Sequence, residues 1–139
     1  MKPVLQFIVL GSAVVASLCA QDVTPADLAG FTQSPTEHQL VVLDHPIPVT
    51  SVEGRVNFQD RPQEALPNVL FEIRGPDATT RITQATTDAQ GRFRIRNVKA
   101  GSYKFKTTLN GFKSVFGTIV VSKKAPKGST ITLGMWPGN

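Results

Sequence analysis

The chain has 139 residues, with 15 basic and 10 acidic side chains and a formal net charge of +5. This length fits one domain with short extensions. With His38, His45 and Cys19 as its sole histidines and cysteine, the chain has too few ligands of the usual kind for a hydrolytic zinc site and cannot form an intramolecular disulfide.

The first twenty residues have the pattern of a signal peptide. Lys2 supplies a positive start, residues 4–15 are largely apolar, and Leu18-Cys19-Ala20 offers a cleavage site. The apolar stretch is too short for a convincing membrane span. Lipid attachment at Cys19 is the alternative, but the bulky Leu18 stands where lipoprotein signals have a small residue. We predict a secreted or periplasmic protein that does not span a membrane, with a signal peptide at 1–20.

Residues 21–50 are polar and interrupted by prolines, which predicts a linker or N-terminal arm. Thr24-Pro25-Ala26-Asp27 has residues that favour a helix start, and the apolar run 40–43 offers a short strand. We expect both histidines to be exposed loop residues. A triad of Ser34, His38 and Asp44 would lie on flexible chain, whereas catalysis needs rigid positioning. We therefore predict a non-enzymatic protein with no metal and no cofactor.

After residue 51, short apolar–polar alternations are separated by glycine, proline, asparagine and aspartate, which favours strands over helices. We expect Asp88 to Gly91 to form a tight hairpin turn and Asn110-Gly111 to form a type I′ turn. The pattern predicts an all-β, seven-stranded Greek-key β-sandwich over residues 51–136, followed by a tail at 137–139. The expected strands are 51–58, 68–74, 80–87, 92–97, 102–109, 113–121 and 129–135.

Cations alternate with apolar residues in the segment GRFRIRNVKAGSYKFK, residues 91–106. Strand side chains alternate between faces, so if Phe93, Ile95, Tyr103 and Phe105 point inward, the cations point outward. We predict that the cations share one outward face and form a ligand-binding surface. These residues are Arg92, Arg94, Arg96, Lys104 and Lys106.

Several motifs of residues 51–135 resemble the carboxypeptidase regulatory-like domain, a transthyretin-like (prealbumin-like) sandwich grouped with carbohydrate-binding-like folds. The resemblance implies fold more than activity, because its motifs are turns and core positions. Family members often have a glycine in the turn after the first strand, and residues 59–65 contain none. The motifs are Gly54-x-Val56, Leu66-Pro67-Asn68-Val69 with Phe71 and Ile73, Thr86-Thr87-Asp88-x-x-Gly91-x-Phe93-x-Ile95, Gly101-x-Tyr103-x-Phe105 and Gly111-Phe112.

The charge distribution indicates the leading function. From Arg81 to Lys127 there are eleven basic residues and one acid, Asp88, so a clustered positive potential would attract polyanions. The leading hypothesis is a binding module for carbohydrate or another anionic glycan of the cell envelope. The plain alternative is that each cation only keeps the sheet soluble. Replacing the five cations with glutamine is predicted to weaken polyanion retention and leave the melting temperature nearly unchanged.

Two further interpretations remain. A structural module that docks on an envelope protein, by a strand edge or the N-terminal arm, is the alternative function. Nucleic acid is not an expected ligand, because Phe93, Tyr103 and Phe105 have the opposite parity from the cations and cannot stack beside them. Trp136 either closes the end of the sandwich, which we favour, or presents its ring for stacking on a sugar.

Overall fold

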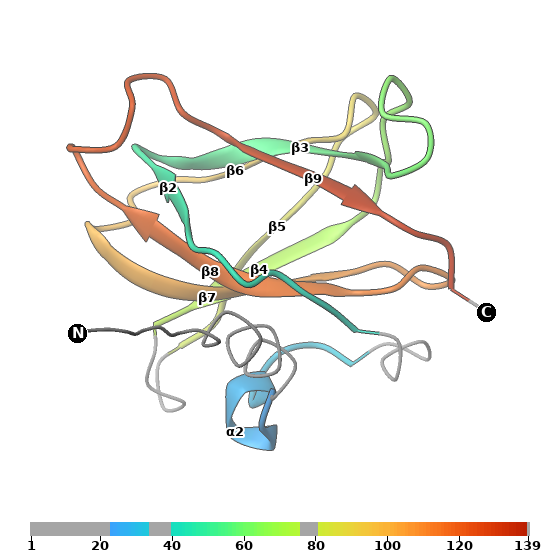
Figure 1. Cartoon of the computed structure of the whole chain (residues 1–139), viewed down its shortest axis with the longest axis horizontal. Helices are drawn as coiled ribbons and strands as arrows, with labels where there is room; N and C mark the ends of the chain where they lie inside the picture. Colours follow the sequence, from blue (N-terminus) through green and yellow to red (C-terminus); the bar gives the residue numbers. More distant parts are fainter. Residues whose placement is uncertain (1–22, 34–39, 76–80, 139) are drawn as a thin grey trace, which may run out of the picture.

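Two β-sheets packed face to face form the protein (Figure 1). The structure is a computed structural model in which residues 23–33, 40–75 and 81–138 are described. The predicted signal peptide with Cys19, and His38 in the arm, lie outside the described residues. The all-β Greek-key sandwich predicted from the sequence is confirmed, and each of the predicted strands has a counterpart among β3 to β9.

The larger sheet has the strand order β1-β8-β7-β4-β5, with β2 also paired to β8, and the smaller sheet has the order β6-β3-β9. Strands β3 and β9 pair in parallel. Strand β7 pairs antiparallel with both β4 and β8. The strands are β1 (Val41–Val42), β2 (Ile47–Val49), β3 (Val52–Phe58), β4 (Leu70–Arg74), β5 (Thr83–Thr86), β6 (Arg92–Ile95), β7 (Gly101–Thr108), β8 (Val115–Val121) and β9 (Ile131–Met135).

Strands β1 and β2 correct the linker interpretation of residues 21–50. Both pair with the edge of β8 in parallel, and Val49 is fully buried in the core. The apolar residues of 40–49 thus complete an edge that would otherwise leave the backbone of β8 unpaired. The sandwich therefore begins before residue 51, and a truncation at residue 50 would remove two of its strands.

The segment of residues 23–33 is also ordered against the domain, and we call it the strap. Its helical turn α2 (Pro25–Leu28) begins at Thr24, whose side chain and that of Asp27 form a capping box, with proline at the start of the helix. The predicted helix start is confirmed. In Figure 1 α2 lies below the larger sheet, on the side away from the smaller sheet.

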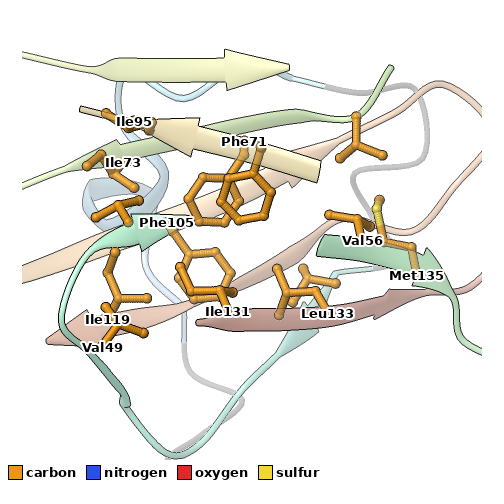
Figure 2. Close-up of a cluster of buried hydrophobic side chains, with 14 of the residues drawn as sticks. Val49, Val56, Phe71, Ile73, Ile95, Phe105, Ile119, Ile131, Leu133 and Met135 are labelled. Carbon is orange, nitrogen blue, oxygen red and sulfur yellow. The ribbon is translucent and has the colours of Figure 1, made fainter. Parts of the chain in front are cut away.

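A stack of aromatic rings joins the two sheets in the core (Figure 2). Phe71 of β4 stacks on Phe93 of β6, with ring centroids 4.2 Å apart, and on Phe105 of β7, at 5.4 Å. Ile131 and Met135 of β9 are fully buried beside the aliphatic residues of the larger sheet. The inward positions expected for Phe93, Ile95 and Phe105 are confirmed.

The two predicted turns form, but not as expected. Gly91 has a φ of +74° and Asp88 caps the turn, yet β5 and β6 belong to different sheets, so the turn is not a hairpin. Asn110-Gly111 does join the paired strands β7 and β8. Of these two central residues, Gly111 alone has a positive φ, +89°, which fits a type II turn, whereas a type I′ turn requires a positive φ at both.

Thr87 holds the turn before β4 in place. Its buried hydroxyl donates to the carbonyl of Leu66 at 2.8 Å and accepts from the N–H of Val69 at 2.9 Å. Replacing Thr87 with valine is expected to lower the free energy of unfolding by about 2 kcal/mol, because it leaves buried backbone groups without a partner. Chemical denaturation measures the loss. Thr87→Ser retains the hydroxyl, so an equal loss in the serine variant would contradict this role.

Candidate functional site

The five predicted cations do not share one face. Arg92 and Arg94 lie on β6 of the smaller sheet, whereas Lys104 and Lys106 lie on β7 of the larger sheet. The chain crosses from one sheet to the other between these strands. The outer faces of the two sheets point to opposite sides of the sandwich. The cations do point outward from their own strands as predicted, but those of β6 and those of β7 therefore lie on opposite sides. The prediction of a single cationic face is therefore wrong.

The two lysines are also less accessible than predicted. Lys104 is half-buried, and its Nζ donates to Thr118 Oγ1 at 3.3 Å. Lys106 has no exposed surface, because the strap covers it, and its Nζ donates to the carbonyl of Thr32. Glutamine at position 106 would therefore disturb a buried contact, which corrects the prediction that all five replacements leave the melting temperature unchanged.

Arg92 and Arg94 remain exposed, and the fold adds a further arginine to them. In the register of β3 with β6, Arg55 lies opposite Arg92 and Glu53 lies opposite Arg94. A cleft of about 470 Å³ opens here. We call it the arginine cleft; its lining residues are Glu53, Gly54, Arg55, Ala85, Thr86, Asp88, Arg92, Phe93, Arg94 and Thr130. Arg96 follows β6 and lines two smaller hollows nearby.

The electrostatics of the arginine cleft favour an anion. Like charges directly opposite on neighbouring strands repel, so the Arg55–Arg92 pair costs stability. None of the cleft arginines Arg55, Arg92 and Arg94 forms an ion pair with a described residue. The cleft acids already accept hydrogen bonds from their own surroundings: Glu53 from the Ser51 hydroxyl at 2.7 Å, and Asp88 from backbone N–H groups at 2.9 Å.

Sequence reasoning missed Arg55 and Glu53 as members of this site. The signal was present, because Val52 and Val56 alternate with Glu53 and Arg55 as apolar residues alternate with cations in β6. Recognising the pair as neighbours of Arg92 and Arg94 required the pairing of β3 with β6. These strands are separated by more than thirty residues of chain, including two strands of the other sheet.

Trp136 does not close the end of the sandwich, which corrects the interpretation favoured from the sequence. It follows β9 and is 43% exposed, while the preceding Met135 fills the core. Thr130 of the arginine cleft precedes the other end of β9, so the two positions are separated by about 20 Å of extended chain. Trp136 therefore offers an exposed ring at the opposite end of the strand from the cleft.

The remaining chemistry of the described residues is limited. In ranges 23–33, 40–75 and 81–138, no three His, Cys, Asp or Glu residues gather as a metal site would require. His45 is exposed as predicted, and its hydrogen bond at 2.8 Å lowers the pKa of Asp44. Across the same ranges, no helix has the length and apolar character needed to cross a membrane.

Comparison with known proteins identifies the sandwich. The family model of the carboxypeptidase regulatory-like domain, a regulatory rather than catalytic domain, matches residues 51–134. No curated protein matches the chain. Among solved structures, one similar chain is from a type II cohesin–X–dockerin complex of Acetivibrio cellulolyticus, with a TM-score of 0.43 and 21% identity. The match covers 64% of this chain and 58% of that one, and at this level it supports no inference about binding. The chain belongs to the carboxypeptidase regulatory-like domain family.

Proposed function

We propose that this chain is an exported, non-enzymatic module that binds an acidic carbohydrate of the cell envelope in the arginine cleft. The observation that carries the proposal is the convergence of Arg55, Arg92 and Arg94 on one cleft with no ion pair to a described acid. Guanidinium groups bind carboxylate or sulfate through paired hydrogen bonds, so an anionic ligand would offset the repulsion between the opposed arginines.

The mixed lining of the cleft favours a sugar over a uniform polyanion. Glu53 and Asp88 lie among the arginines, and Thr86 and Thr130 add hydroxyl groups. Carboxylates repel a closely spaced row of phosphates but accept hydrogen bonds from sugar hydroxyls. An acidic monosaccharide unit provides both kinds of partner, a carboxylate for the arginines and hydroxyls for the acids. A longer glycan that follows β9 would reach the exposed ring of Trp136.

Replacing Arg55 and Arg92 together with glutamine is expected to weaken binding of acidic glycans at least about tenfold, because hydrogen bonds to charged groups contribute about 1.5–3 kcal/mol each. A glycan array with acidic and neutral versions of the same sugars, run at two salt concentrations, identifies the ligand. Titration calorimetry then measures the loss. Melting temperature should change little, because both side chains are exposed.

The matched control replaces Lys123 and Lys124 with glutamine. This variant loses the same net charge at exposed positions that do not line the cleft. Binding should persist in the control. An equal loss in both variants, or retention of acidic and neutral glycans to the same extent, would show attraction by net charge alone and would refute a carbohydrate site in the arginine cleft.

A further inference from the structure

The outer face of the larger sheet carries buried charges beneath the strap. In one row across β8, β7 and β4, the register places Phe116, Lys106 and Glu72 side by side. In the next row it places Thr118, Lys104 and Arg74. Glu72 and Arg74 are each 2% exposed and Lys106 is fully buried. Charged side chains are rarely buried to this extent on the outer face of a sheet, so the cover over them is specific.

The charged side chains contact mainly the backbone of the strap. Arg74 donates from Nη2 to the carbonyls of Ala26 and Asp27, at 2.8 and 2.6 Å. Glu72 accepts the N–H and the hydroxyl of Thr32, both at 3.0 Å, while Lys106 donates to the carbonyl of the same residue. Opposite charges thus bind the two backbone groups of one residue. This arrangement is that of a peptide-binding site, with the strap as its ligand.

One aromatic side chain anchors the strap. Phe31 is 6% exposed and packs edge-on against Phe116, with centroids 6.0 Å apart, while the guanidinium of Arg74 lies 5.2 Å from its ring centroid. Helical turn α2 contributes no buried residue. Asp27 has its pKa lowered by the backbone N–H of Thr24 and by the charges of Lys104 and Arg74, so the strap brings a negative charge to a positive surface.

Opening of the strap is less costly than its hydrogen bonds indicate. When the strap leaves, three charged groups regain water, which recovers much of the desolvation cost of closing. Even when closed, Nε of Arg74 is buried without a hydrogen bond to a described residue. Phe31 is the one buried apolar side chain among the described strap residues, and Val23, Leu28 and Ala29 are only half-buried. The closed state therefore depends on the high local concentration of a tethered ligand, which is typically about millimolar.

We propose that this face is a peptide-binding site that accepts the strap of a second copy of this chain, so that two chains exchange straps in a two-fold symmetric dimer. Every contact made within one chain is available between two, because each copy carries both strap and site. The register gathers Arg74, Lys104 and Lys106 around one acid, Glu72. Asp27 is the one charged residue of the strap, so strap and site are complementary in charge. The exchange does not use the arginine cleft and is independent of the proposed glycan binding.

A complementation experiment tests the exchange with full-length chains. Phe31→Ala weakens the strap and leaves the site intact, whereas Arg74→Met weakens the site and leaves the strap intact. Mixing the two should produce a heterodimer with a dissociation constant at least about tenfold below that of either variant alone, because one intact strap then meets one intact site. Sedimentation equilibrium of differently labelled chains measures this, and circular dichroism confirms that each variant is folded.

Two controls keep the test decisive. Phe58→Ala truncates an aromatic ring outside the strap. If this variant forms a heterodimer with Arg74→Met as well as Phe31→Ala does, the cause is general loosening of the fold, and the proposal is overturned.

If Arg74→Met does not fold, a labelled peptide of residues 23–33 is titrated into the wild-type and Phe31→Ala chains. The variant should bind it at least about tenfold more tightly, because its own strap competes less. Equal affinity of the peptide for the two chains would overturn the proposal, and so would the absence of a heterodimer at concentrations up to about 1 mM.

Discussion

Replacing Glu72 with alanine is expected to lower the free energy of unfolding by about 2–3 kcal/mol, because removing one member of a buried charged group leaves the others uncompensated, while opening of the strap limits this cost. Glu72 is the one buried acid among the described residues, and it lies opposite Lys106 and two positions from Arg74. The variant also loses both hydrogen bonds from Thr32. Urea denaturation followed by circular dichroism measures the change.

Two further substitutions separate the causes of this loss. Glu72→Gln keeps the size and an acceptor oxygen but removes the charge, so its loss should be smaller than that of alanine. Glu64→Ala removes an exposed acid whose ion pair with Arg61 is solvent-accessible, and its effect should stay within about 1 kcal/mol. A loss in Glu72→Ala no larger than in Glu64→Ala would contradict a buried charged group under the strap.

The strands were predictable from the sequence, but their distribution between sheets was not. Alternation fixes which side chains of a strand point inward, and Phe93, Ile95 and Phe105 obey it. It does not state which sheet a strand joins, because that choice depends on pairing between residues far apart in the chain. Strand β6 pairs with β3, and β7 pairs with β4 and β8, so the short, mostly exposed segment between β6 and β7 passes from one sheet to the other.

The same limit applies to the candidate site. Arg92 and Arg94 were predicted as outward cations, and the structure places them outward. Lys106 also points outward from its strand, yet it is buried because the strap covers it. The alternation of a strand does not reveal what covers its outer face. The strap that covers Lys106 falls in residues 21–50, whose prolines and polar residues predict a linker. Its attachment depends on Arg74 and Glu72, which are forty or more residues from their strap partners in the sequence.

Replacing Phe71 with alanine is expected to cost about 3–5 kcal/mol, because the fully buried ring leaves a cavity between two others that cannot close without moving both sheets. Against a typical total stability of about 5–15 kcal/mol, this loss would leave a substantial unfolded population at physiological temperature. Phe71→Leu retains much of the volume and should lose about half as much. Thermal and urea denaturation measure both variants. Equally small losses would show that the rings of Phe93 and Phe105 close the gap, and that the stack does not hold the sheets together.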